Sequence, residues 1–183
     1  MTLEQISNRN LLSPVGFKLI LDRCNKVDFF AQSANIPGIS MGTATQPTPF
    51  KDIDLPGDKI QYDDLNVRFL VDEDMENYLQ IYKWLIGLGY PDNMDQFTDL
   101  KKQREYLNRG GSADPFNLYS DGTLQILNSS LRSKVSVKFK ELFPTSLSTL
   151  NFDASENDTT YFTAEVTFRY TIFKIVDLNG NEY

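Results

Sequence analysis

ANIPGISMGTATQPTPFKDIDLPGD, residues 34–58, reads at first as a β-strand, because small and polar residues alternate through its first half. Pro47 and Pro49 then interrupt the alternation, and Pro56-Gly57-Asp58 is a turn signal. The ribbon is small and polar on both faces, whereas a buried strand needs at least one apolar face. The stretch therefore predicts a long ribbon that does not belong to a core.

Strand patterns flank this ribbon on both sides. The predicted strands are 15–23, 27–33, 60–72, 123–127, 134–143 and 160–176. The turn-like residues 24–26 favour a hairpin between the first two of these strands. The last stretch alternates most regularly, with Phe162, Val166 and Phe168 on one face, and reads as one long strand. These patterns predict a small antiparallel β-sandwich or barrel.

One amphipathic α-helix is predicted at 73–88, where apolar residues recur at offsets of three and four and acidic residues crowd the first turn. Gly89 and Pro91 follow this pattern and act as stop signals. Packing of this helix against the sheet is expected to involve Tyr78, Tyr82, Trp84 and Leu85.

The stretch after this helix is less regular. Residues 92–108 carry a weaker and more polar helical pattern, which predicts a surface helix or an ordered excursion. Residues 110–122 contain glycine and proline breaks that are typical of a loop. The chain of 183 residues, 40% of them hydrophobic, is long enough to bury one core. We therefore predict a single α+β domain over residues 1–183.

The composition excludes several classes of protein. The chain has no histidine, which rules out a serine–histidine or cysteine–histidine nucleophilic pair and a histidine-containing zinc site. Its one cysteine, Cys24, cannot form an internal disulfide and is read as a buried thiol. The net charge of −7 argues against a protein that grips nucleic acid, although an acidic protein can let DNA pass without sticking. Without a secretion signal or an apolar run of about 18 residues, neither secretion nor membrane insertion is predicted.

Acidic clusters are the remaining candidates for metal binding or acid–base chemistry. They are Asp72-Glu73-Asp74, then Asp92 with Asp95 and Asp99, and finally Asp153 with Glu156 and Asp158. The first cluster caps a helix, the second lacks the ligand order and central glycine of a calcium loop, and the third lies in turn chemistry. We predict no catalytic residue, no metal, no cofactor and no enzyme activity.

Several short motifs follow one another between about residue 15 and residue 176. They are Pro37-Gly38, Gly57-Asp58, Asp63-Asp64-Leu65, Asp72-Glu73, Trp84 and Leu142-Phe143-Pro144-Thr145. In this order and spacing the chain resembles the tail tube protein family of contractile-tailed bacteriophages. Residues 92–122 look like an insertion relative to the plain tube subunit, and the NGNEY tail at 179–183 extends past the usual end. These departures leave open a main tube subunit, a tube initiator at the baseplate and a tail-completion protein at the neck.

The resemblance implies a structural virion protein. Six subunits would form a ring, each giving four strands to a continuous 24-stranded barrel, and stacked rings would form the inner tube used for DNA ejection. A barrel of that size has a backbone diameter of about 48 Å, wide enough for double-stranded DNA to pass without specific binding. The polar ribbon would complete its hydrogen bonds by pairing edge to edge with neighbouring copies.

The resemblance also assigns expected roles to residues and partners. The residues expected in the inter-subunit hairpin are Ile39, Met41, Thr43, Thr45, Ile53 and Leu55. Alternation places Asp52 and Asp54 on the face away from Ile53, and we expect them to line an acidic channel that repels phosphate. The implied partners are other copies of the chain, the tail sheath, baseplate or neck proteins and the tape measure protein, with no membrane. The implied location is the virion tail, assembled in the host cytoplasm.

Two other classes of function stay open at this stage. A monomeric ligand-binding β-sandwich would need surface aromatic residues, but the only tryptophan, Trp84, lies in the predicted helix. An enzyme using paired carboxylates would need a catalytic partner, and the sequence offers no plausible one. Rings or tubes seen by microscopy would favour the structural role, and a monomer at all concentrations would weaken it. A glycan array would test the ligand-binding module.

Overall fold

Alternation of apolar and polar residues builds the centre of the sheet. In β5 (Leu65–Leu70) and β8 (Thr163–Arg169) every second side chain is buried. The two strands are antiparallel partners, with Val67 directly opposite Val166. Because alternate residues point to opposite faces of a strand, this register turns one continuous apolar face toward the core. The predicted alternation in these two stretches is confirmed.

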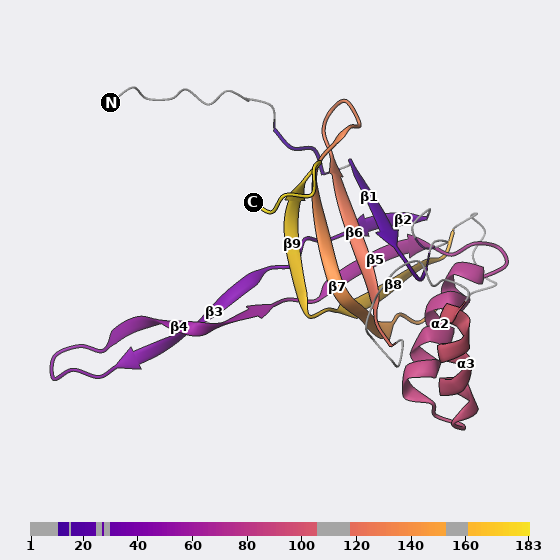
Figure 1. The fold of residues 1–183 in the computed structure, drawn as a ribbon, viewed down its shortest axis with the longest axis horizontal. Helices are drawn as coiled ribbons and strands as arrows, with labels where there is room; N and C mark the ends of the chain where they lie inside the picture. Colours follow the sequence, from indigo (N-terminus) through magenta and orange to yellow (C-terminus); the bar gives the residue numbers. More distant parts are fainter. Residues whose placement is uncertain (1–10, 15, 25–26, 28–29, 106–117, 153–160) are drawn as a thin grey trace.

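The computed structural model describes residues 11–14, 16–24, 27, 30–105, 118–152 and 161–183, except for the side chains of 101–105. The further elements in these ranges are β1 (Phe17–Leu21), β2 (Ala31–Ala34), β3 (Ile39–Gln46), β4 (Ile53–Tyr62), α2 (Glu76–Gly89), α3 (Asp95–Glu105), β6 (Ser120–Leu127), β7 (Ser133–Leu147) and β9 (Ile172–Asp177). Seven strands form one antiparallel sheet in the order β1-β6-β7-β8-β5-β2, with β9 also paired with β7 (Figure 1).

The remaining two strands, β3 and β4, form a separate hairpin that projects from the sheet (Figure 1). The predicted α+β fold of antiparallel strands with a packed helix and a long hairpin is confirmed. The large sheet is open, because its end strands β1 and β2 do not pair with each other. The barrel alternative for the single chain is therefore not what the fold adopts.

Strand β7 belongs to both halves of the large sheet. Its first part, up to Lys140, pairs with β9, and its last part, from Phe143, pairs with β8. Between these parts Glu141 has a positive φ of 55°, and the register of β7 against β6 shifts. A β-bulge of this kind bends a strand and increases its twist. The bend lets two differently oriented halves of the sheet share one strand.

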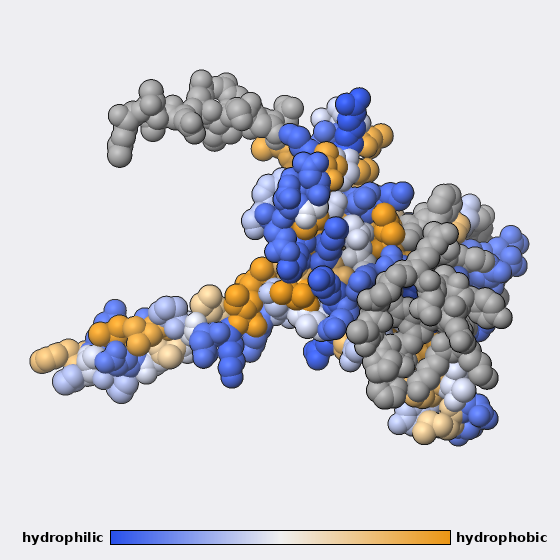
Figure 2. All heavy atoms as spheres, viewed as in Figure 1, coloured by the Kyte–Doolittle hydropathy of each residue, from blue (hydrophilic) through white to orange (hydrophobic). Residues whose placement is uncertain are grey.

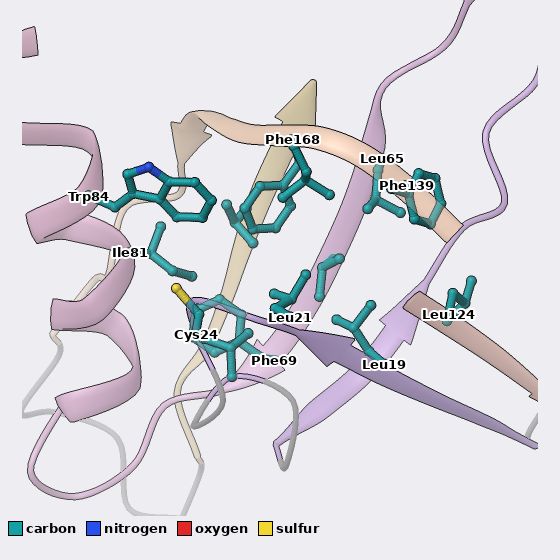
Figure 3. Packing of buried hydrophobic residues seen from close by; sticks show 14 of the residues in the cluster. Leu19, Leu21, Cys24, Leu65, Phe69, Ile81, Trp84, Leu124, Phe139 and Phe168 are labelled. Carbon is teal, nitrogen blue, oxygen red and sulfur yellow. The ribbon is translucent and has the colours of Figure 1, made fainter. Parts of the chain in front are cut away.

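The core lies between the sheet and α2 (Figure 3). The ring of Trp84 lies 6.2 Å from that of Phe168, and the guanidinium of Arg23 lies 4.9 Å from the Trp84 ring. The indole N–H of Trp84 donates a hydrogen bond of 3.0 Å to the carbonyl of Leu118, which satisfies the only polar atom of this buried side chain. Cys24 is a buried free thiol, as predicted.

Helix α2 begins three residues later than predicted, at Glu76, and ends at Gly89. Met75 and Tyr90 flank the helix with left-handed backbone conformations. The amide of Tyr90 donates to the carbonyl of Ile86 at 2.7 Å, which is the hydrogen bond of a C-terminal cap. The left-handed residue that stops the helix is therefore Tyr90 and not Gly89.

The buried line of α2 differs from the predicted one. Trp84 is buried, and Tyr78 and Leu85 are half-buried and pack against the core. Tyr82 is 48% exposed, so the expectation that it packs within the chain is wrong. The physical reason is that the helix buries another line of residues against the sheet and α3, consisting of Asn77, Ile81, Trp84 and Gly87.

Two predictions of strand pairing are wrong. Strand β1 pairs with β6 and β2 pairs with β5, so the hairpin expected over 15–33 does not form. The long strand expected over 160–176 is interrupted at Tyr170 and Thr171 and consists of β8 and β9. Local alternation shows that a segment is extended, but its partners are set by contacts with segments distant in the sequence.

The helical pattern after α2 forms α3, which packs on α2 through Leu100 and Gly87. The predicted surface helix is thus confirmed over 95–105. The loop predicted at 110–122 is described only from residue 118, and residues 120–122 already belong to β6. That residues 92–122 are an insertion stays a prediction.

Candidate assembly surface

The hairpin β3–β4 is the part of the described chain least covered by other residues. Its register pairs Ile39 with Tyr62 at the root and Gln46 with Ile53 near the tip. Apart from Gly57 and Tyr62, every residue of its two strands is exposed. The ribbon that the sequence placed outside the core therefore projects from the body (Figure 1).

Large apolar side chains remain exposed along this hairpin. Phe50 at the tip is fully exposed, and between 43% and 59% of the surface is exposed in Ile39, Met41, Ile53, Leu55 and Ile60. Figure 2 shows these apolar residues as separate groups near the root and in the outer half. Soluble monomers rarely expose contiguous apolar patches, and such patches mark surfaces that bind other molecules. The hairpin is therefore less polar than its sequence suggested.

The apolar side chains change face along the hairpin. Near the root, Met41 lies opposite Ile60, on one face of the two-stranded ribbon. Nearer the tip, Leu55 lies opposite Ala44 and on the other face, together with Ile53. The polar residues occupy the opposite face in each half: Ser40 and Gln61 near the root, and Thr45 and Asp54 near the tip.

The twist of the ribbon compensates for this change of face. Figure 1 shows β3 above β4 near the body and below it near the tip, so the strands cross over between the two halves. Such a crossing brings opposite faces of the two halves to the same side, and Figure 2 shows apolar residues of both halves in one view. The hairpin thus offers one apolar side along its length.

The absence of a side chain at Gly57 allows the two strands to approach closely where they cross. The register shifts between Met41 and Thr43, where β4 has extra residues around Gly57. A Cβ atom on Gly57 would lie 2.4 Å from the carbonyl oxygen of Gly42, which no side chain can occupy unless the backbone moves. The Pro56-Gly57-Asp58 segment is therefore a bulge inside β4, and its interpretation as a turn before a new strand is wrong.

Aromatic side chains hold the root of the hairpin against the sheet. The Tyr62 ring lies 5.3 Å from that of Phe173 and 6.1 Å from that of Tyr170. The phenol of Tyr170 donates a 2.8 Å hydrogen bond to the carbonyl of Asp63. Burial raises the pKa of Tyr170 to about 12, with smaller contributions from the Asp63 and Asp64 carboxylates, so the phenol keeps its proton at neutral pH.

Polar contacts also hold the root of the hairpin against the large sheet. Asn35 donates from its side-chain amide to the carbonyl of Asp64 at 3.1 Å, and it accepts the amide N–H of Asn66 at 2.6 Å. Arg169 of β8 forms an ion pair of 3.1 Å with Asp64. These contacts tie the entry and the exit of the hairpin to the large sheet, so its direction relative to the body is set within the chain.

The residues predicted for the channel and the interface lie along this hairpin. Asp52 is exposed just before β4, and Asp54 accepts a weak 3.4 Å hydrogen bond from the Thr45 hydroxyl. Thr43 and Thr45 share the face of Asp54, whereas Ile53 and Leu55 lie on the opposite face, as the alternation predicted. Their roles as channel and interface residues stay predictions.

Sequence reasoning missed the root residues Asn35, Tyr62, Arg169 and Tyr170. The adjacent aspartates Asp63-Asp64 before a buried strand were a local signal for this region, but nothing local showed which residues they would meet. In the described ranges, no group of three acidic or cysteine residues is arranged to hold a metal ion. The acidic cluster at 153–158 lies outside those ranges. None of the described helices is long and apolar enough to span a membrane.

Comparison with known proteins connects this architecture to one family. A family model described as phage tail tube protein matches residues 9–176. The tail tube terminator protein of Enterobacteria phage T4 is 28% identical over 180 residues, which cover 94% of this chain and 92% of that protein.

Solved structures share the fold at lower sequence identity. A chain from the cryo-EM structure of the anti-feeding prophage tube-terminating cap has a TM-score of 0.55 at 15% identity, covering 97% of this chain and 98% of that one. A chain from the extended sheath–tube complex of the PVC extracellular contractile injection system has a TM-score of 0.55 at 16% identity, covering 97% and 99%.

The family match is decisive because of its extent. Residues 9–176 include the whole hairpin, its root and both halves of the large sheet. Both the family description and the name of the T4 relative refer to a structural part of a phage tail. The chain therefore belongs to the phage tail tube protein family and is a structural, non-enzymatic component of a virion tail.

Proposed function

We propose that the chain forms a hexameric ring of the tail tube and that the hairpin β3–β4 joins each subunit to its neighbours. The observation that carries this proposal is an exposed apolar side on a hairpin whose root is locked in place. The name of the T4 relative favours the position at the end of the tube, as a terminator next to the neck. The main tube and the baseplate initiator are the alternative positions.

Covering the apolar side of the hairpin can contribute several kcal/mol to assembly. Full burial of an isoleucine, leucine or methionine side chain contributes about 1.5–3 kcal/mol. Ile39, Met41, Ile53, Leu55 and Ile60 are each about half exposed, so covering their free surface contributes about 1 kcal/mol apiece. Each hairpin in a closed ring would thus add about 5 kcal/mol before any backbone pairing is counted.

Within this ring we assign Asp52 and Asp54 to the channel side, where their carboxylates repel phosphate over a screening length of about 8 Å. Double-stranded DNA would then pass without specific binding. The other contacts we propose are with sheath, neck or baseplate proteins and with the tape measure protein, during assembly in the host cytoplasm.

The interface is tested by placing charge on the apolar side. Ile53→Asp combined with Leu55→Asp should leave a folded monomer, because both side chains are exposed, and should abolish rings in mass photometry and negative-stain microscopy. Ser40→Asp combined with Gln61→Glu adds the same charge on the polar face near the root and should leave assembly intact. Equal assembly of both double variants would refute the role of the apolar side.

The channel assignment has a separate test. Asp52→Lys combined with Asp54→Lys should leave ring formation intact and impair DNA passage, measured as infectivity in a complementation assay. Normal infectivity with these lysines in place would remove both residues from the channel.

A further inference from the structure

One half of the large sheet has a solvent face that the assembly role leaves unexplained. Strands β1, β6, β7 and β9 lie side by side in this half (Figure 1). Their inner face carries buried apolar residues such as Leu19, Leu124 and Val137. Their outer face follows from the same alternation and consists of the residues between these buried positions.

Lysine dominates this outer face. In β7 the residues that alternate with the buried ones include three exposed lysines, β1 adds one more exposed lysine, and β9 adds a half-buried one. We call this set the lysine face, and it consists of Lys18, Lys134, Lys138, Lys140 and Lys174. The remaining outward residues in the middle of the face are small or uncharged, including Thr123 and Gln125. Figure 2 shows hydrophilic residues gathered along β9 and the strands beside it.

Three of the five lysines lie close to one another. Lys138 and Lys174 are direct cross-strand partners, and Lys140 follows Lys138 on the same face of β7. Like charges in directly opposite positions destabilise a sheet, so the fold alone does not favour this arrangement. Lys174 forms a 2.5 Å ion pair with Glu182, and among the described residues no ion pair is formed by Lys138 or Lys140.

Acidic residues are confined to the margins of the lysine face. Besides Glu182, Asp121 and Glu141 lie exposed at one end of it. Asp121 accepts the amide N–H of Glu141 at 3.2 Å, and Glu141 accepts the hydroxyl of Thr171 at 2.5 Å. The centre of the face thus has an excess of positive charge in a chain whose net charge is −7. The hairpin with its aspartates projects away from this sheet, and charges farther than about 8 Å are largely screened at physiological salt (Figure 1).

We propose that the lysine face binds the phosphate backbone of DNA through weak, sequence-independent electrostatic contacts. Protein partners are held chiefly by buried tryptophan, tyrosine and arginine anchors, and the centre of this face has none among the described residues. Lys138, Lys140 and Lys174 are spaced about 5–7 Å apart on the sheet, and with Lys18 and Lys134 farther away they supply the point charges that a row of phosphates needs more than shape. The proposal goes beyond ring assembly, and its direct test needs no ring.

The test is a salt titration of binding to a short fluorescein-labelled DNA duplex, followed by fluorescence anisotropy between about 50 and 200 mM salt. Four lysines free to contact phosphate predict a slope of about −3 to −4 in log K against log salt, with a weak affinity in the range of about 10⁻⁴–10⁻⁶ M. Lys138→Glu combined with Lys140→Glu should reduce the slope to about −2 and weaken binding on the order of tenfold.

Two further variants separate the effect of the lysine face from the effect of the net charge of the chain. Lys59→Glu combined with Lys83→Glu makes the same change of charge on the hairpin and on α2, and it should leave the slope unchanged. Glu182→Gln releases Lys174 and should strengthen binding and steepen the slope by about 1. All five positions concerned lie at the surface, so circular dichroism should show the variants to be folded.

Several outcomes would overturn the proposal. They are absence of salt-dependent DNA binding by the wild-type chain, an equal loss in the two lysine double variants, or tighter binding to poly-glutamate than to DNA, which would assign the face to an acidic protein surface. Mass photometry of the same samples separates this question from assembly. DNA binding can fail while rings persist, and the lysine face can bind DNA even where rings do not form.

Discussion

Gly87→Ala is a substitution whose sign depends on how closely the two helices pack. Gly87 is buried in α2 and faces Leu100 of α3. A Cβ atom at position 87 would lie 2.8 Å from the Leu100 Cβ and 2.9 Å from its Cδ1. Carbon atoms in contact prefer separations of about 3.5–4.0 Å. The Leu100 Cβ is fixed by its own backbone, so a change of rotamer cannot relieve the closest contact.

Two effects of opposite sign then compete in the free energy of unfolding. Replacing glycine by alanine inside a helix stabilises it by about 0.8–1 kcal/mol. Forcing a methyl group into a filled interface costs about 1–3 kcal/mol. Because α3 must move as a unit, the steric cost should win, and we expect Gly87→Ala to destabilise the chain by about 1 kcal/mol.

Gly89→Ala in the same helix is the matched control. No atom lies within 4 Å of a Cβ built at Gly89, so alanine there should stabilise the chain by about 0.4–1 kcal/mol. Urea denaturation followed by circular dichroism measures both changes, with equal m-values as the check on comparability. If Gly87→Ala stabilises as much as Gly89→Ala does, the close packing of α3 on α2 is refuted.

Three further substitutions test the core, the hairpin root and the C-terminal turn. Trp84→Phe removes the indole N–H that donates to the Leu118 carbonyl and puts a smaller ring in the core, and it should cost about 1–3 kcal/mol in urea denaturation. The pKa of Tyr170 is about 12 in the folded chain, against an ordinary value of 10.0. Its contribution to stability is therefore complete below about pH 10 and is lost as pH rises toward 12. The Tyr170→Phe variant, which has no phenol to titrate, should not show this loss of stability between about pH 10 and pH 12 in urea denaturation. Hydrogen bonds, first from the backbone of Asn181, lower the pKa of Asp177. Asp177→Ala removes the acceptor of the Asn179 and Asn181 amides and should therefore speed the exchange of these two amides measured by NMR.

The strands with one buried face were predictable because their signal is local. The alternation in β5 and β8 arises from the two faces of a single strand, and it requires no knowledge of the neighbours. For α3 the weaker helical pattern over 92–108 left open a surface helix or an ordered excursion, and the helix is the alternative that forms. For α2 the apolar residues are spread too widely around the helix, and Tyr82 was assigned to a buried line that in fact runs through Asn77.

Pairing was not predictable because its determinants are distant in the sequence. Strand β1 meets β6 about a hundred residues later, and no local feature of 15–33 distinguishes this from a hairpin. The alternation over 160–176 continues through Tyr170, but the hydrogen bond of Tyr170 to Asp63 lies at the point where β8 ends. The separation into β8 and β9 follows the bend of β7 at Glu141, which is visible only once all three strands are in place.

For the candidate site, the sequence predicted the existence of the hairpin but not its apolar side. The alternation correctly separated Ile53 from Asp54, but the change of face at Gly42 and Gly57 depends on a backbone contact between two strands. The glycines were visible, and Gly57 was assigned to a turn because Pro-Gly-Asp occurs in turns more often than in bulges.

The locked root gives the exposed hairpin a physical role that exposure alone would not provide. A free ribbon that orders only on binding loses conformational entropy at that moment, about 1–2 kcal/mol for each residue fixed. The Tyr170 and Arg169 contacts fix the direction of the hairpin before any neighbour arrives, so much of this cost is met when the chain folds. The about 5 kcal/mol available from its apolar side can then act on association. Weakening the root should therefore impair assembly more than it lowers the stability of the monomer.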